Sequence, residues 1–150
     1  MKYFCLIIFF LIFNLNSTLA NELKFTTNPD AVCNNGEQAT FTIKRAKSKK
    51  WAIILPGGGV ARNADEYKSR SEGMKSPELK PHYFGQAIEK DVEDKNYNMV
   101  FIPYCSSDLY QGNHFNIVDG KEIPFKGRVI VNDILDQLND QLKQADEIIF

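Results

Sequence analysis

Three consecutive glycines, Gly57, Gly58 and Gly59, follow the apolar segment 51–55 after a single proline, Pro56. A glycine loop after a buried strand can turn backbone N–H groups toward an anion, because glycine has no Cβ to block the turn. The dinucleotide fingerprint does not fit, since it needs a glycine where Arg62 stands, and no Gly-Lys-Ser/Thr follows for a P-loop. Two interpretations stay open: a donor of amide protons to the oxyanion of an acyl-transfer reaction, and a plain turn.

No further residues of the sequence form a catalytic set. It contains no Gly-x-Ser-x-Gly, and Ser106 and Ser107 follow a proline-tyrosine pair rather than a strand-to-helix elbow. His82 and His114 lie in polar stretches and are expected to be solvated, whereas Asp108 is expected to order its own loop. We therefore assign no catalytic residue within the chain, and expect Ser106, Ser107 and Asp108 to form the edge of a pocket.

Residues 1–20 have the pattern of a signal peptide. Lys2 precedes the apolar run 4–13, and Thr18 and Ala20 are small residues at the positions that a signal peptidase reads. The run is short for a bilayer span, so no stable membrane span is expected after its removal. The mature chain, 21–150, is then expected in a secreted or periplasmic compartment.

Cys33 and Cys105 remain once Cys5 leaves with the signal peptide. In an oxidising compartment they can form a disulfide with each other, or each can pair with a cysteine beyond Phe150. Neither lies in a Cys-x-x-Cys spacing, and with two histidines in the chain no zinc or other metal site is expected. The formal net charge of -1 gives no reason to expect nucleic acid, and the basic stretch 44–50 is interpreted as a solvated hairpin tip.

The elements that must position the glycines follow from hydrophobic periodicity. Residues 40–44 alternate as in a half-exposed strand, and 51–55 are continuously apolar, as in a strand covered on both faces. A hairpin is expected to join these two strands. The remaining elements, in chain order, are a long polar excursion to about Gln86 with one short helix, a strand over 97–102, a loop over 104–125, an amphipathic helix over 127–143 that buries Ile130, Ile134, Leu138 and Leu142, and a strand that begins at Glu147.

This order predicts an α/β domain with a mostly parallel sheet. Ligands of such sheets bind at the carboxyl ends of the strands. The loops after Leu55 and Ile102, and whatever follows Phe150, are therefore expected to converge on one site.

Four segments resemble those of the pectin acetylesterase/Notum family of carboxylesterases, in the family's order. Residues 51–59 resemble its strand and Leu-Glu-Gly-Gly-Gly loop, and 103–112 resemble its Pro-Tyr-Cys-Ser-Ser-Asp segment with a trailing glycine. Residues 125–128 and the following helix resemble its Gly-Arg helix, and 33–36 its Cys-x-Asp-Gly. Pro56 replaces an acidic residue of the family, and Val60 and Ala61 replace an aromatic residue and a cysteine.

The resemblance implies the amino-terminal portion of an α/β-hydrolase-like three-layer fold. It also implies a Ser-His-Asp mechanism, no metal or organic cofactor, and a small ester, acylated glycan or lipidated substrate. Gly58 and Gly59 would be the oxyanion-hole donors, with Gly57 shaping the turn. The family's nucleophile elbow follows the strand that Glu147 begins, so the triad would lie beyond residue 150.

Two hypotheses of different classes remain. The chain is either the amino-terminal fragment of a secreted carboxylic ester hydrolase, truncated before the nucleophile elbow, or a non-catalytic secreted remnant of that fold that binds a glycan or lipid. The first is favoured, because a sheet that ends at an apolar strand leaves a long edge unpaired.

Overall fold

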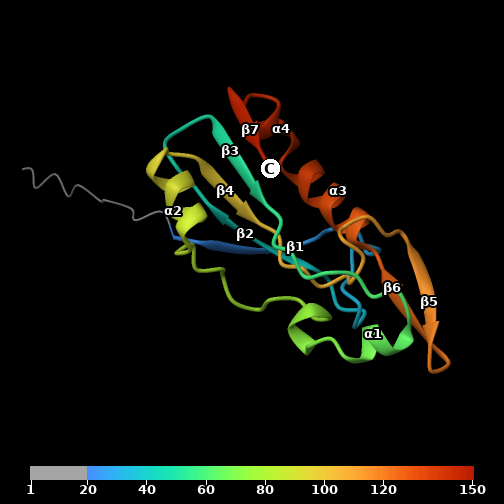
Figure 1. Cartoon of the computed structure of the whole chain (residues 1–150). Coiled ribbons are helices and arrows are strands. Elements are labelled where there is room, and N and C mark those ends of the chain that lie inside the picture. The colour runs from blue at the N-terminus through green and yellow to red at the C-terminus, as the bar shows by residue number, and fades with distance from the viewer. Residues whose placement is uncertain (1–19) are drawn as a thin grey trace, which may run out of the picture.

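The computed structural model describes residues 20–150. The predicted signal peptide covers residues 1–20 and, apart from Ala20, lies outside the described residues. A five-stranded sheet forms the centre of the described part, in the spatial order β1-β2-β4-β3-β7 (Figure 1). Its strands are β1 (Glu22–Phe25), β2 (Thr40–Lys44), β3 (Lys50–Ile54), β4 (Asn98–Phe101) and β7 (Glu147–Ile149).

The sheet is mixed, so the prediction of a mostly parallel sheet is wrong. β3 runs parallel to both β4 and β7. β2 runs antiparallel to β4, and β1 antiparallel to β2. The parallel part is therefore confined to β4, β3 and β7, and the two first strands form an antiparallel flank.

The predicted hairpin between residues 40–44 and 51–55 is also wrong, because β4 lies between β2 and β3. The segment that connects β2 to β3 is held by the side chain of Asn98, the first residue of β4. This side chain accepts a hydrogen bond from Ala46 N at 2.9 Å and donates to the carbonyls of Ser48 and Lys50, each at 2.9 Å. Three side-chain hydrogen bonds to backbone thus replace the direct pairing that adjacency in sequence suggested.

Helices cover both faces of the sheet, as the continuously apolar β3 predicted. Trp51 and Ile53 pack on one face, in the same apolar cluster as Ile130 and Ile134. Ala52 packs on the opposite face with Phe84, Tyr97, Met99 and Phe101. Successive residues of a strand point to opposite faces, so a strand buried on both sides needs an unbroken apolar run.

The amphipathic helix predicted over 127–143 is present as two helices. They are α3 (Gly127–Gln137) and α4 (Asn139–Leu142), which meet at Leu138. Ile130, Ile134 and Leu138 are buried as predicted, with at most 3% of each exposed, whereas Leu142, also predicted to be buried, is half-buried. On the other face of the sheet lies α2 (Ala87–Asp94), which the sequence analysis did not assign.

β2 is buried rather than half-exposed. Its threonines alternate with apolar residues, but their hydroxyls are bonded to the segment that covers them. Thr40 donates to the carbonyl of Glu78 at 2.8 Å, and Thr42 accepts from the amide of His82 at 2.9 Å. A polar strand residue is buried at little cost when each hydroxyl has such a partner.

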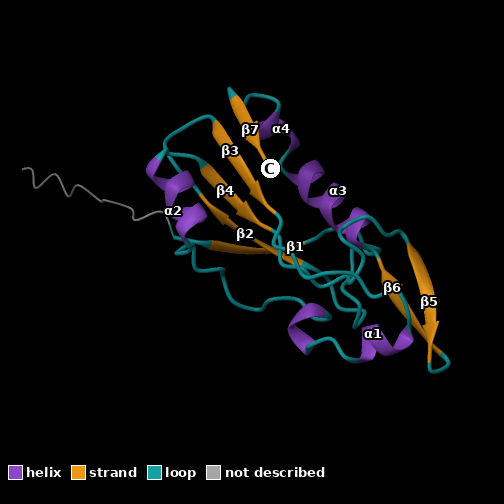
Figure 2. Ribbon diagram, viewed as in Figure 1, coloured by secondary structure: helices purple, strands orange, loops and turns teal. Residues whose placement is uncertain are grey.

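A second sheet lies within the region predicted as a loop over 104–125. It is the antiparallel hairpin of β5 (His114–Val118) and β6 (Lys121–Phe125). Asp119 and Gly120 form its turn, both with positive φ, and Asp-Gly is a strong hairpin signal. The hairpin lies at the end of the molecule toward which the arrows of β3 and β4 point, close to α1 (Ala64–Lys68) (Figure 2).

The polar excursion after the glycines contains α1 and one 3-10 turn, η1 (Glu72–Met74). Within residues 20–150, no helix is long and apolar enough to cross a membrane.

Candidate functional site

The loop 55–61 leaves the carboxyl end of β3 and meets the loop 103–112, which leaves the neighbouring strand β4. The amide of Ala61 donates to the carbonyl of Ser107 at 2.9 Å, and Val60 forms a β-bridge with Asp108. Two of the three loops expected at this edge are therefore joined by backbone contacts.

Two tyrosines of the second loop hold the carbonyls of the glycine loop from one side. The hydroxyl of Tyr110 lies 2.9 Å from the carbonyl of Ile102 and 3.2 Å from that of Pro56, and it shares its single proton between them. The hydroxyl of Tyr104 donates to the carbonyl of Gly59. In contrast, among residues 20–150 no hydrogen bond is donated by the amide of any of the three glycines.

Burial keeps both phenols protonated. It raises the pKa of Tyr110 strongly, and the neighbouring Tyr104 and Asp108 raise it further. Burial also raises the pKa of Tyr104, against the lowering effect of the Leu109 amide and Arg70. Both hydroxyls therefore stay hydrogen-bond donors well above neutral pH.

The three glycines are not equivalent. A Cβ on Gly58 would lie 2.0 Å from Cδ1 of Tyr104, so only glycine fits against that ring. Gly59 has a φ of +71°, which side chains other than glycine rarely adopt. A Cβ on Gly57 would meet nothing within 4 Å.

Cys33 and Cys105 form a disulfide, one of the two alternatives left open by the sequence, with a Cα–Cα distance of 5.1 Å. Both residues are buried, at 0% and 2% exposure. Next to the bridge, Asn34 donates to the carbonyls of Ser106 at 3.0 Å and Pro124 at 2.6 Å. The disulfide thus links the turn at residues 33–36 to the loop 103–112, at the residue that follows Tyr104.

Asp108 organises the loop 103–112 and the start of α3. Its Oδ1 accepts from the hydroxyl of Ser106 at 2.6 Å and from the amide of Tyr110 at 3.0 Å. Its Oδ2 accepts from the amides of Gly112 at 3.1 Å and Gly127 at 2.8 Å. A carboxylate with four donors around it is a structural centre of the loop rather than a base with a vacant oxygen.

Ser106 and Ser107 are buried, at 1% and 0% exposure, in agreement with the absence of an elbow at this position. Ser107 has a φ of 54°, and Leu109 and Tyr110 follow with positive φ as well. Three non-glycine residues in the left-handed region within four positions mark a backbone that its surroundings force into shape. Ser107 and Asp108 lie at the rim of a polar cavity of about 400 Å³ beside the β5–β6 hairpin.

The expectation that both histidines are solvated is wrong for His82. Its ring stacks on Phe101 with centroids 3.5 Å apart, and its Nε2 lies 2.8 Å from Oε1 of the buried Glu89. The imidazole thus packs on an aromatic ring of the sheet, and one of its ring nitrogens is hydrogen-bonded to Glu89 of α2. His114, on β5, is exposed. Among residues 20–150, no group of three or more His, Cys, Asp or Glu side chains is arranged to hold a metal ion.

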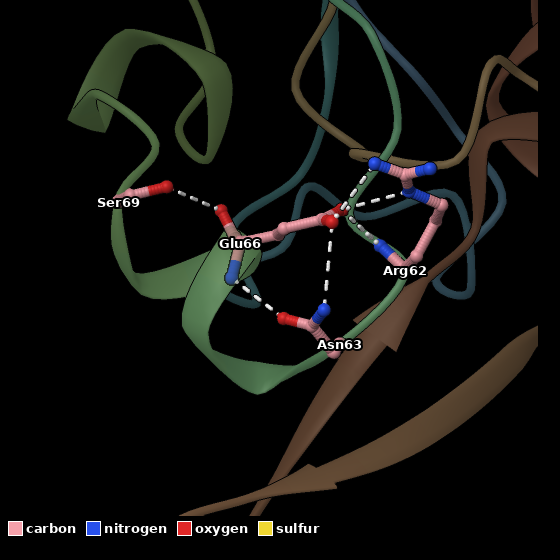
Figure 3. A network of polar contacts seen from close by, with 4 residues as sticks. All are labelled: Arg62, Asn63, Glu66 and Ser69. Carbon is pink, nitrogen blue, oxygen red and sulfur yellow. Dashed lines mark hydrogen bonds and ion pairs between the residues drawn. The ribbon is translucent and has the colours of Figure 1, made fainter.

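Arg70 is a residue of the site that the sequence analysis did not identify. Its Nη1 donates to the carbonyl of Gly58 at 2.7 Å. It follows α1, whose turn is fixed by a polar network (Figure 3). In that network the side chain of Asn63 accepts from the amide of Glu66 at 2.9 Å, and Ser69 donates to the Glu66 carbonyl at 2.9 Å.

On the side of Pro56 and Gly57, the loop borders a largely apolar cavity of about 580 Å³. Its wall includes Leu79, Phe101 and Tyr104. The polar cavity at Ser107 and Asp108 lies beside Val60 and Ala61, and Gly58 and Gly59 line a third cavity, of about 530 Å³, together with Arg70.

The geometry defines a class of protein: an α/β domain in which β3 is followed by a glycine loop, and the amides of its three glycines donate to no group among the described residues. The chain belongs to the pectinacetylesterase family, whose profile matches residues 15–150. It is similar to palmitoleoyl-protein carboxylesterase notum1a of Danio rerio, with 34% identity over 127 residues that cover 78% of this chain and 25% of the relative. It is also similar to palmitoleoyl-protein carboxylesterase notum2 of Xenopus laevis, with 32% identity over 139 residues that cover 85% of this chain and 28% of the relative.

The chain thus spans about a quarter of the length of these two relatives, and it is homologous to the amino-terminal part of such carboxylesterases. A shorter relative, the inactive palmitoleoyl-protein carboxylesterase notum1b of Danio rerio, is 32% identical over 102 residues, which cover 61% of this chain and 73% of the relative.

Proposed function

We propose that this chain is the amino-terminal part of a secreted carboxylic ester hydrolase of the α/β-hydrolase type. In this proposal the amides of Gly58 and Gly59 stabilise the oxyanion of the tetrahedral intermediate, and Gly57 completes the turn. The Ser-His-Asp triad is supplied by residues after Phe150, where β7 adjoins β3.

The observation that carries this proposal is the state of the glycine loop. Its carbonyls are bound by Tyr110, Arg70 and Tyr104, whereas the amides of Gly57, Gly58 and Gly59 donate to no group within residues 20–150. An oxyanion hole needs donors that are fixed before the reaction and free to receive the developing charge. Gly57 and Gly59 are exposed, and a plain surface turn would not require three side-chain anchors.

The substrate class follows from the family and from the two cavities beside the loop. Esters are the substrates that the family implies, and the relatives are named as palmitoleoyl-protein carboxylesterases. The apolar cavity of about 580 Å³ can receive an acetyl or longer acyl group, and the polar cavity of about 400 Å³ can receive the alcohol part. We therefore propose a small ester, an acylated glycan or a lipidated protein as the substrate.

The buried Cys33–Cys105 disulfide supports a secreted or periplasmic location, because disulfides persist in oxidising compartments. The predicted signal peptide of residues 1–20 is part of the same proposal.

A second candidate is a non-catalytic protein of this fold that binds a glycan or lipid. The short relative whose name describes it as inactive favours this candidate. Here the same two cavities would bind a ligand without hydrolysis.

The experiment is to sequence the DNA after the codon of Phe150 and to express the complete reading frame. A frame that continues into Gly-x-Ser-Ala-Gly-Gly with later Asp and His, and a protein that hydrolyses p-nitrophenyl acetate, would support the esterase. A confirmed stop codon after Phe150, or a full-length protein without hydrolysis of acetyl or long-chain p-nitrophenyl esters, would favour the binding protein.

A further inference from the structure

Arg70 binds the carbonyl of Gly58. This carbonyl lies in the backbone between the two proposed oxyanion donors, the amides of Gly58 and Gly59. The Nη1 of Arg70 donates to the carbonyl of Gly58 at 2.7 Å and lies 3.4 Å from the Sδ of Met74. The guanidinium also lies over the ring of Tyr104, 5.9 Å from its centroid. The charged group is therefore fixed against the loop from one side by three neighbours.

The direction of an amide follows from the direction of the carbonyl in the same peptide unit. A peptide bond is planar, and in the trans form its C=O and N–H point in opposite directions. The described residues contain no cis peptide bond. Because Arg70 binds the carbonyl of Gly58, the N–H of Gly59 must point away from Arg70.

The two tyrosines act on other peptide units. Tyr110 binds the carbonyl of Pro56 and so orients the amide of Gly57. Tyr104 binds the carbonyl of Gly59 and so orients the amide of Val60. Within residues 20–150, the side chain that fixes the amide of Gly59 is that of Arg70.

We propose that Arg70 is the positioning residue of the oxyanion loop, which turns the amide of Gly59 toward the reacting carbonyl by binding the carbonyl of Gly58. This inference rests on the proposed function, because it assigns the direction of an amide that the esterase would use. The hydrogen bond from the charged guanidinium favours this orientation of the peptide over a rotated one.

Among the described residues, no hydrogen-bond partner of Nε or Nη2 competes with the glycine loop for Arg70. The nearby Glu66 bonds to Arg62 instead, with Nη2 to Oε1 at 3.0 Å, which leaves Arg70 to the glycine loop.

The test uses the protein expressed from its complete reading frame, with p-nitrophenyl acetate as the probe. Arg70→Gln should lower kcat about 10- to 100-fold and change KM by less than about 3-fold, since it removes orientation of one oxyanion donor. Arg70→Lys keeps a cationic donor and should recover part of the lost kcat. Arg62→Gln is the matched control, because Arg62 is an exposed arginine of the same segment that bonds to Glu66, and it should leave kcat unchanged.

Crystal structures of the wild-type protein and Arg70→Gln give a second measurement, independent of activity. The Gly58–Gly59 peptide should be rotated or split between two orientations in Arg70→Gln and single in the wild type. If the wild type hydrolyses no ester, the proposed function fails while the peptide orientation still tests Arg70. An unchanged peptide in Arg70→Gln, wild-type kcat in that variant, or an equal loss of kcat in Arg62→Gln would overturn the proposal.

Discussion

The ring of Tyr104 occupies the space beside the α-carbon of Gly58, so that a Cβ on this glycine would lie 2.0 Å from Cδ1 of the ring. The ring cannot swing aside freely. Its hydroxyl donates to the carbonyl of Gly59 and accepts from the amide of Leu109 at 2.7 Å. Because of this contact, a glycine is required at position 58 as long as Tyr104 occupies its place in the loop after β4.

Gly58→Ala is expected to destabilise the protein by about 1–3 kcal/mol, because the added methyl group forces the Tyr104 ring out of its position. Gly57→Ala is the matched control, since its Cβ would meet nothing within 4 Å, and it should change the free energy of unfolding by less than about 0.5 kcal/mol. Urea unfolding of both variants checks this. Equal effects of the two substitutions would contradict the role assigned to the Tyr104 contact.

Asp108→Asn is expected to lower the free energy of unfolding by about 2–4 kcal/mol. The asparagine side chain would place N–H donors against backbone amides that now donate hydrogen bonds to the Asp108 carboxylate. Those amides belong to Tyr110, Gly112 and Gly127. The comparison is Asp119→Asn in the turn of the β5–β6 hairpin, where the exposed carboxylate pairs with Lys68 at 2.8 Å. That change should be within about 0.5 kcal/mol of wild type by chemical denaturation. A tolerated Asp108→Asn would mean that the carboxylate does not organise its loop.

Loss of the disulfide by Cys33→Ser is expected to destabilise the folded state by about 2–5 kcal/mol, because the bridge closes a long loop of the unfolded chain. The two cysteines are 72 positions apart in sequence. Thermal unfolding of the purified protein measures the effect, and reduction of the wild type should reproduce it. Cys5→Ser, within the predicted signal peptide, should leave the mature protein unchanged; a shift in its melting temperature would show that Cys5 is retained.

The stability of the protein is expected to fall in acid through Glu89. Burial disfavours the charge of this carboxylate, but hydrogen bonds from the amides of Gln86 and Gly85 and from His82 outweigh burial and lower its pKa below its usual value. A group with a lowered pKa in the folded state stabilises the protein above its unfolded pKa, and this stabilisation disappears as pH falls through the folded value.

Glu89→Gln should therefore be less stable than wild type at pH 7, by about 1–3 kcal/mol, and should lose less stability between pH 5 and the folded pKa. Unfolding curves across that range provide the measurement. The exposed Glu78 offers a control, because Glu78→Gln should keep the wild-type pH dependence. If Glu89→Gln and wild type have parallel curves, Glu89 does not carry the acid sensitivity.

The sequence predicted the elements whose burial is periodic. The unbroken apolar run at Trp51 and Ile53 indicated a strand covered on both faces, and the four-residue spacing from Ile130 to Leu138 indicated the helix now seen as α3. These patterns are local, because each depends on the period of one element. The position of the glycine loop was predicted from the end of the same apolar run.

The arrangement of the strands was not predictable in this way. Adjacent strands with a polar connection suggest a hairpin, yet β4 enters between β2 and β3 and is held there by Asn98. The partners of the glycine loop were missed for the same reason: Arg70 and Tyr110 reach it from segments whose own patterns do not indicate a contact. The β5–β6 hairpin, by contrast, had a local signal in Asp119-Gly120 that the analysis left unused.

The insertion of β4 into the sheet fixes when the protein can fold during its synthesis. Trp51 of β3 pairs with Asn98 and, on its other side, with Ile148. The chain leaves the ribosome from its amino terminus, so β3 emerges long before either neighbour. An apolar strand without partners invites aggregation. The order of strands in space thus makes this segment a late-folding one, which can complete its pairing only after β7 has been synthesised.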